Sequence, residues 1–135
     1  GAQQAMEDAG IRFEDKLYGL SNYDFESAYH AMNGLLARRA EFTALFAMSD
    51  VIAFGAIRAL VSAGLRVPED VSVIGFDGIT MSRYCVPVMT TIVQPSEQIA
   101  LQSIELLVRQ IEHGTPAQTV TLQPELQQGE SVRAI

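Results

Sequence analysis

The sequence holds a single cysteine, Cys85, and only two histidines. One cysteine excludes an internal disulfide and a cysteine-based zinc cluster. Basic residues are scarce as well: nine lysines and arginines stand against sixteen aspartates and glutamates, a formal net charge of −7. Surfaces that bind nucleic-acid phosphates are usually basic. We therefore do not expect this chain to bind DNA or RNA with its own surface.

Long apolar runs are also missing. No stretch reaches the roughly 18 apolar residues that indicate a membrane span, and no charged start followed by an apolar stretch indicates a signal peptide. The chain begins at Gly1 rather than at a methionine, in a segment whose pattern is already helical. We expect that it was cut from a longer protein.

Catalytic and cofactor-binding motifs are lacking too. The sequence has no G-x-G-x-x-G, Walker loop, H-E-x-x-H or G-x-S-x-G. His30 lies within a predicted helix and is expected to be a surface or half-buried side chain. His113 falls in the last turn of another helix, where the dipole favours a cation. Cys85 lies in an apolar loop and is expected to be a buried or interface thiol. We predict no enzymatic activity, no metal and no cofactor.

What the 135 residues do contain is enough apolar material for one folded domain, 48% hydrophobic against 19% charged. Helical and extended patterns alternate along the chain. The predicted helices cover residues 2–9, 24–39, 49–64 and 95–112. The predicted extended segments are 16–20, 42–48, 71–76, 90–93, 118–122 and 125–132. The run Phe42–Met48 is almost wholly apolar, as in a strand that is covered on both faces.

This alternation predicts an α/β fold with a doubly wound, mostly parallel sheet. In such sheets ligands bind at the carboxyl ends of the strands. Two carboxylates stand there: Asp50 and Asp77. Asp50 is explained either as a residue that begins a helix or as a ligand contact. Asp77 directly follows a buried strand, beside Gly78, and is explained either by ligand contact or by capping of the loop.

Four segments in the same order carry a family resemblance. Gly64–Asp77 closely resembles a segment of the lactose/galactose repressor family of bacterial transcription regulators. Phe46–Asp50 with Gly55–Leu60 resembles that family's strand and helix, and Pro87–Pro95 its crossing segment. The chain from Gly1 onward resembles the helix that follows an effector-contacting arginine. The resemblance covers essentially the whole chain.

The resemblance implies a domain organisation. Family members have a DNA-binding helix-turn-helix domain and a two-lobed sensor that is similar to periplasmic sugar-binding proteins. Residues 1–94 would be the sensor's C-terminal lobe. Residues 95–122 would be a helix and strand that pack on an N-terminal lobe outside this chain, and residues 123–135 the returning tail. With that lobe missing, we expect the apolar face of the helix to dock on a second copy of the chain rather than stand free in solvent.

The family's effector contacts fall on four positions of this sequence. They are an aromatic ring at Tyr23, a hydroxyl at Ser49 where the family commonly has asparagine, an acid at Asp77 and an amide at Gln94. An aromatic ring stacks on a sugar or a base, although Tyr23 is also explained as a residue packed at a helix entrance. The second aspartate common in repressors is Gly78 here. A small sugar, a sugar phosphate or a nucleoside fits one aromatic ring with Asp77 and Gln94, and the lack of a Lys or Arg of this lobe near them disfavours a phosphate.

A homodimer is the second implied assembly. The apolar loop before Val88 is unusual for a solvated segment, and the family dimerises through the corresponding elements in a two-fold contact. A cluster within the lobe is the alternative explanation. The interface residues predicted on this basis are Val51, Phe54, Arg58, Tyr84, Cys85 and Val86.

Two functions of different class fit these features. The first is the effector-sensing and dimerising part of a cytoplasmic transcription regulator, which would bind operator DNA only through its missing N-terminal domain and would not bind membranes. The second is one lobe of a periplasmic solute-binding protein of a sugar transporter, which Gly78 favours. A third interpretation is a small α/β enzyme. The sequence offers no nucleophile with a base and no set of metal ligands to support it.

Overall fold

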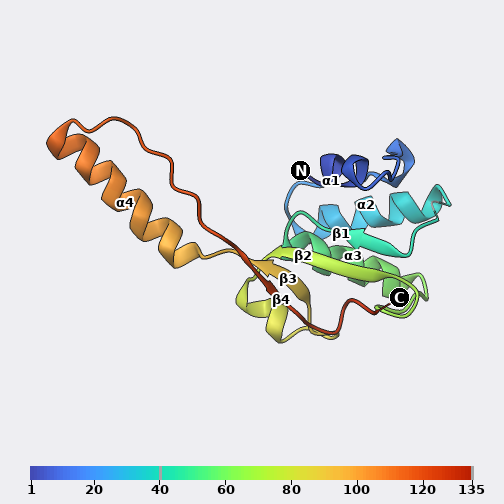
Figure 1. The fold of residues 1–135 in the computed structure, drawn as a ribbon. Helices are drawn as coiled ribbons and strands as arrows, with labels where there is room; N and C mark the ends of the chain where they lie inside the picture. The colour runs from blue at the N-terminus through green and yellow to red at the C-terminus, as the bar shows by residue number, and fades with distance from the viewer. Residues whose placement is uncertain (40, 135) are drawn as a thin grey trace.

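The computed structural model describes residues 1–39 and 41–134, which form helices around one small sheet (Figure 1). The α-helices in this part of the chain are α1 (Ala2–Asp8), α2 (Phe25–Ala37), α3 (Asp50–Ser62) and α4 (Ser96–His113). The strands are β1 (Ala44–Phe46), β2 (Ser72–Asp77), β3 (Thr90–Val93) and β4 (Glu125–Gln127). Two short 3₁₀ helices, η1 (Asp15–Leu17) and η2 (Thr80–Arg83), lie in the connections.

The sheet has the order β1-β2-β3-β4. The first three strands are parallel, and β4 is antiparallel to β3. Parallel neighbours need a crossover connection, and α3 provides it between β1 and β2. The predicted α/β class with a mostly parallel sheet is confirmed.

The core lies between the helix pair and the sheet. Helices α2 and α3 pack side by side, and α3 runs along β2. They approach so closely that a side chain at Gly55 would stand 2.4 Å from the carbonyl oxygen of Phe25. The buried side chains that fill this space are Met32, Leu35, Ala53, Ala56, Ile57, Leu60, Val71, Val73 and Met89.

The C-terminal tail returns to the sheet and is bonded to it at Ser131. Its buried hydroxyl accepts a hydrogen bond from the backbone N–H of Thr90 (2.8 Å) and donates one to the carbonyl of Val73 (2.6 Å). The backbone N–H of Val73 donates to the carbonyl of Ser131 at 2.7 Å. One residue thus joins β2, β3 and the tail, so the tail belongs to the lobe. Of the predicted extended segment 125–132, Glu125–Gln127 is strand.

Two strand predictions need correction. Residues 16–20 form no strand: η1 covers Asp15–Leu17, and the backbone at Gly19 lies against Leu35 of α2. A strand needs a neighbour to bond to, and this segment packs on a helix instead. The run 42–48 is not covered on both faces: Phe46 and Met48 are exposed. Its strand, β1, lies at the edge of the sheet.

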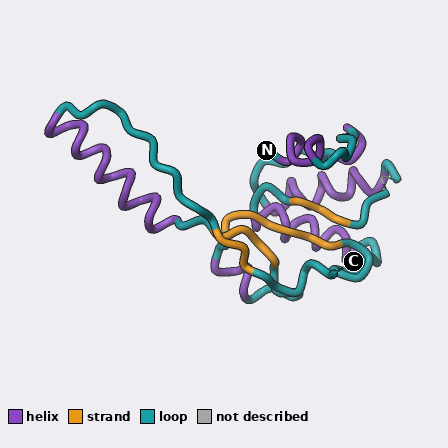
Figure 2. The backbone as a smooth tube through the Cα atoms, viewed as in Figure 1, coloured by secondary structure: helices purple, strands orange, loops and turns teal. Residues whose placement is uncertain are grey.

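Helix α4 and the segment that follows it form an arm that projects from the ends of β3 and β4 (Figure 2). Ile104, Leu107 and Ile111 are exposed along it, Ile111 by 73%. The single chain therefore leaves this apolar face uncovered, and its docking on a second copy stays a prediction. Residues 118–122 form no strand either. A segment far from any other strand has no partner for its backbone groups.

None of the helices described is long and apolar enough to cross a bilayer. Within the same residues, no group of three or more histidine, cysteine, aspartate or glutamate side chains is placed to hold a metal ion.

Candidate functional site

The strand ends bring Asp77 and Gln94 together. In the parallel pairing of β2 and β3, Asp77 stands opposite Val93, the last residue of β3, so Gln94 follows beside the end of β2. The backbone N–H of Gln94 donates to the carbonyl of Asp77 at 3.1 Å. Its side-chain Nε2 donates to the Asp77 carboxylate at 2.7 Å. Two of the four predicted effector contacts therefore form a hydrogen-bonded pair.

The chain turns sharply after this pair. Asp77 has φ of 115° and Gly78 has φ of 73°. A non-glycine residue in that region costs about 1–3 kcal/mol, and such residues concentrate at ligand sites. A Cβ at position 78 would stand 2.7 Å from Cα of Val93, so only glycine fits without a shift. Close packing on β3 thus accounts for Gly78 where repressors commonly have a second aspartate.

Asp50 is fully buried and is hydrogen-bonded to this turn. Its carboxylate accepts a hydrogen bond of 2.5 Å from the hydroxyl of Thr91 on β3. The other carboxylate oxygen accepts a bond of 2.8 Å from the backbone N–H of Ile79. Asp50 is the first residue of α3, as predicted, and its charge is favourable there. Its bonds to β3 and to the turn were not predicted.

Ser49 is buried at the same end of α3 and acts as its N-cap. Its hydroxyl accepts a hydrogen bond of 3.2 Å from the backbone N–H of Ile52. This bond satisfies one of the free amides at the start of the helix. The hydroxyl is therefore already engaged in this structure, and Ser49 lies next to Asp50 rather than open to solvent.

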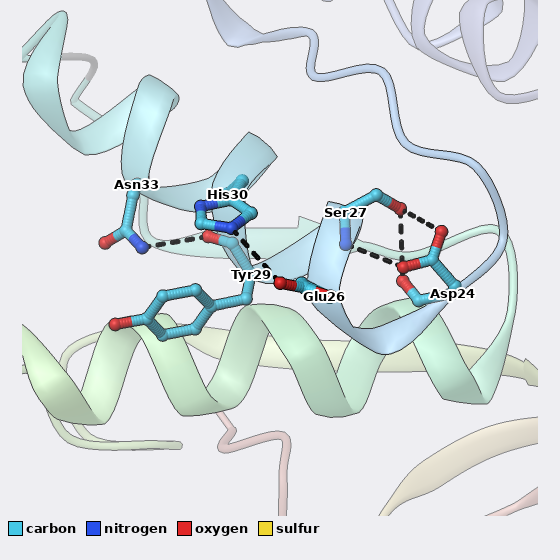
Figure 3. A network of polar contacts seen from close by, with 6 residues as sticks. All are labelled: Asp24, Glu26, Ser27, Tyr29, His30 and Asn33. Carbon is cyan, nitrogen blue, oxygen red and sulfur yellow. Dashed lines mark hydrogen bonds and ion pairs between the residues drawn. The ribbon is translucent and has the colours of Figure 1, made fainter.

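Tyr23 directly precedes Asp24, the N-cap residue of α2. Figure 3 shows the hydrogen bonds of this cap between Asp24 and Ser27. Asp24 accepts a hydrogen bond from the N–H of Ser27 and another from its hydroxyl, both at 2.7 Å. These bonds lower the pKa of Asp24 from its ordinary value. Tyr23 has φ of 55°, and the residue is 64% exposed. Within residues 1–39 and 41–134 no hydrogen bond joins Tyr23 to Asp77 or Gln94.

The rest of α2 shows only structural contacts. His30 is exposed, as predicted, and lies 3.9 Å from the carboxylate of Glu26 one turn earlier (Figure 3). The side-chain amide of Asn33 donates to the carbonyl of Tyr29 at 3.0 Å. These are contacts between successive turns of one helix, and they assemble no reactive group.

The predicted interface loop is strongly exposed. Tyr84 is 76% exposed and Val86 93%, large apolar surfaces for a lobe of this size. Arg58 on α3 is exposed, whereas Phe54 is half-buried and packs partly on the core. Val51 is half-buried on the same helix. Exposed apolar groups of this kind mark interaction surfaces.

Cys85 differs from its two neighbours in the loop. Its thiol lies 3.3 Å from the carbonyl of Ser82 and 3.2 Å from that of Pro87. Burial raises the pKa of the Cys85 thiol. A thiol with a raised pKa is a poor nucleophile, in agreement with the expected buried or interface role.

Two open hollows of about 250 and 280 Å³ lie on the arm, between α4 and residues 115–122. They are far along the chain from Asp77 and are lined by side chains such as Leu106 and Leu107. Both sit where a helix and an irregular segment run together without a covering layer, and neither holds a convergent set of charged groups.

The whole chain resembles the sensor domains of known regulators. Residues 1–132 match the family described as periplasmic binding protein-like domain. The chain is 39% identical to the HTH-type transcriptional regulator MalR of Clostridium butyricum over 131 residues, which are 97% of this chain and 39% of that protein. It is 38% identical to the HTH-type transcriptional repressor PurR of Serratia proteamaculans over 133 residues, 98% of this chain and 39% of that one.

The fold gives the same result. The structure of the transcriptional regulator CelR in complex with cellobiose superimposes with a TM-score of 0.90 and 34% identity, over 96% of this chain and 40% of that one. The chain spans about two fifths of the length of the curated relatives that it matches.

Proposed function

Because the chain belongs to the periplasmic binding protein-like domain family, with LacI-family regulators as its relatives, we propose that it is the effector-sensing and dimerising part of a bacterial transcription repressor. The observation that carries this proposal is the Asp77–Gln94 pair at the carboxyl ends of β2 and β3. In open α/β sheets this edge is where ligands bind. The relatives are regulators, which favours this function over a periplasmic solute-binding protein.

The effector is a small sugar or a nucleoside. A carboxylate accepts hydrogen bonds from sugar hydroxyls or from ring N–H groups. The Gln94 amide orients that carboxylate while keeping its own carbonyl oxygen as an acceptor. An exposed aromatic ring such as Tyr23 offers a flat apolar surface for stacking. Ser49 borders the same strand ends, and the opposite lobe supplies the remaining contacts.

The exposed surfaces support the division of the chain that the family resemblance implies. We assign residues 1–94 to the C-terminal lobe, 95–122 to the arm that packs on the N-terminal lobe, and 123–135 to the returning tail. Full burial of one Leu or Ile side chain stabilises a protein by roughly 1.5–3 kcal/mol. Ile104, Leu107 and Ile111 are exposed together on the arm. An N-terminal lobe that covers them would explain why these positions are apolar.

The protein acts as a homodimer in this proposal. The contact is formed by Val51, Phe54 and Arg58 of α3 together with the loop residues Tyr84, Cys85 and Val86. Tyr84 and Val86 supply the exposed apolar surface for it. Operator DNA is bound by an N-terminal domain outside this chain, in the cytoplasm, since the −7 charge of this chain disfavours contact with phosphates.

Effector binding acts by changing the relative populations of two arrangements of the lobes. A ligand that binds between the lobes favours one lobe arrangement only by its differential affinity for the two arrangements. Gln94 precedes Pro95 and the arm, so the candidate site lies where the lobe joins the segment that moves with the other lobe.

The test is a titration of the full-length protein bound to its operator. Anisotropy of labelled operator is followed while cellobiose, lactose, adenosine and guanosine are added separately. One of them should change operator affinity at a concentration that also saturates binding to the protein alone. A full-length protein that has no DNA-binding domain, or whose operator affinity responds to none of the four, contradicts this function.

A further inference from the structure

A buried carboxylate that the proposed function does not use lies behind the candidate site. Asp50 is fully buried, and so is Thr91, whose hydroxyl donates to it at 2.5 Å. The second oxygen accepts the N–H of Ile79 at 2.8 Å. Burying a carboxylate is costly unless hydrogen bonds satisfy it. A cap for α3 alone would not require this burial, because Ser49 already caps that helix.

Strand β2 has a glycine at the position that faces the Asp50 carboxylate. Gly75 lies on β2, and a Cβ at that position would stand 2.2 Å from Oδ1 of Asp50. The same Cβ would stand 3.4 Å from the hydroxyl oxygen of Thr91. An ordinary strand residue at position 75 would therefore exclude the Asp50–Thr91 contact. The close approach of the Asp50 carboxylate to β2 explains why an otherwise apolar strand has glycine at position 75.

The contact to Ile79 fixes the far side of a strained turn. Asp77 ends β2 with φ of 115°, Gly78 follows with φ of 73°, and Ile79 is the next residue. On one side the turn is held by the pairing of Asp77 with Val93. On the other side the Ile79 N–H is held by Asp50, which is itself held by Thr91 on β3. Strained backbone persists only where its surroundings hold it on both sides.

We propose that Asp50 is a positioning residue of the effector site: through Ile79 and Thr91 it holds the Asp77–Gly78 turn and so aims the Asp77 carboxylate at the ligand. This inference rests on the proposed function, because it assigns Asp50 a task at that same site. Asp50 does not contact the effector. It acts through the backbone N–H of Ile79, two residues after Asp77, which does contact it.

The test displaces the Asp50 carboxylate without changing any polar group near the ligand. In the full-length protein, Gly75→Ala puts a methyl group where the carboxylate lies, and Gly34→Ala is the matched control because nothing stands within 4 Å of a Cβ at Gly34. Thr91→Val removes one hydrogen bond to Asp50, and Thr91→Ser restores the hydroxyl. Affinity is measured by calorimetry with whichever of cellobiose, lactose, adenosine or guanosine the wild type binds.

Gly75→Ala should weaken binding about tenfold and Thr91→Val about threefold to tenfold, the range for one lost hydrogen bond. Thr91→Ser should recover most of the loss. The decisive readout is the double variant with Asp77→Asn. If Asp50 acts through Asp77, Gly75→Ala adds little once Asp77 is changed, whereas a merely structural role gives additive losses. Additive losses, or unchanged affinity in a folded Gly75→Ala protein, overturn the proposal.

A crystal structure of the Gly75→Ala protein keeps the inference separate from the proposed function. The expected result is that Asp77 leaves its positive φ or loses its bond to Gln94, and this can be seen without any ligand. If none of the four compounds binds the wild type, the proposed function fails. The crystal structure of the variant still tests the inference in that case. If Gly75→Ala does not fold, the Thr91→Val and Thr91→Ser pair supplies the same comparison. An unchanged Asp77 in either displaced variant overturns the inference.

Discussion

The side-chain amide of Gln94 donates a 2.7 Å hydrogen bond to the carboxylate of Asp77, although 17 positions separate the two residues. They meet because β2 and β3 are parallel and end at the same edge of the sheet. The bond holds one carboxylate oxygen in place, and a carboxylate can accept further hydrogen bonds. An acceptor that is oriented before the ligand arrives loses less freedom on binding.

The first prediction concerns that bond. Gln94→Leu should weaken effector binding by about threefold to tenfold, because the Asp77 carboxylate loses the donor that orients it. Gln98→Ala, at an exposed glutamine in the first turn of α4, is the control and should bind as the wild type does. Calorimetry on the two full-length variants makes the comparison, and equal affinities would show that the Gln94 amide has no part in the site.

The second prediction concerns the turn after β2. Gly78→Ala should destabilise the fold by roughly 1–3 kcal/mol, because the residue needs positive φ and its Cβ would collide with Val93. Gly34→Ala, in open space within α2, should instead stabilise it by roughly 0.5–1 kcal/mol. Urea unfolding measures both. Similar free energies of unfolding for the two variants would contradict the close packing at position 78.

The third prediction is a pH dependence. The guanidinium and backbone N–H of Arg66 donate three hydrogen bonds of 2.8–2.9 Å to Asp70, and they hold the pKa of Asp70 well below its ordinary value of 3.8. A lowered folded-state pKa stabilises the fold fully above that ordinary value, and the contribution is lost as the pH falls toward the folded-state pKa. Both groups are on the surface, so the effect is small.

Melting temperatures of the wild type and of Asp70→Asn test this sign. The wild type should be the more stable by a constant margin above about pH 5, and the margin should shrink below about pH 4. A margin that grows toward acid would show that the pKa of Asp70 is not lowered by folding.

The fourth prediction concerns assembly. If the full-length protein is the proposed dimer, Val86→Glu should convert it to a monomer in sedimentation, because it puts a charge into the proposed contact. The side chain is 93% exposed, so its own lobe should keep its melting temperature. Phe54→Glu is the poorer test, since Phe54 also packs on the core. Leu20→Glu, at another exposed position, is the control; a Val86→Glu protein that stays dimeric places the interface elsewhere.

Much of this fold follows from local sequence signals. Helices α2 and α4 were predicted because their apolar residues recur at helical spacing and because Asp24 and Gly114 mark a start and an end. Strand β3 was predicted with its observed bounds. Asp77 was predicted from the rule that ligands bind at the carboxyl ends of parallel strands, and the family resemblance added Gln94, which the structure places beside it.

What the sequence did not reveal depends on distant partners. The hydrogen bonds of Asp50 join it to residues 29 and 41 positions away in the sequence. No local pattern shows whether an aspartate at a helix start makes such distant bonds or only caps the helix. The glycine at position 75, within an apolar strand, is the one signal that could have indicated it. The segment 16–20 was predicted as a strand from its composition, but a strand exists only where a neighbour offers free backbone groups, and here the segment lies on α2.

The most direct test of the central claim is an effector titration of full-length Asp77→Asn bound to operator. Asparagine keeps the size of the side chain, but it removes the negative charge and replaces one acceptor oxygen with an amide donor. The effector concentration needed to change operator affinity should rise at least about tenfold, the loss expected for hydrogen bonds to a charged group, while the melting temperature and the affinity for operator without effector stay as in the wild type. An Asp77→Asn protein that responds at the wild-type effector concentration would contradict the account.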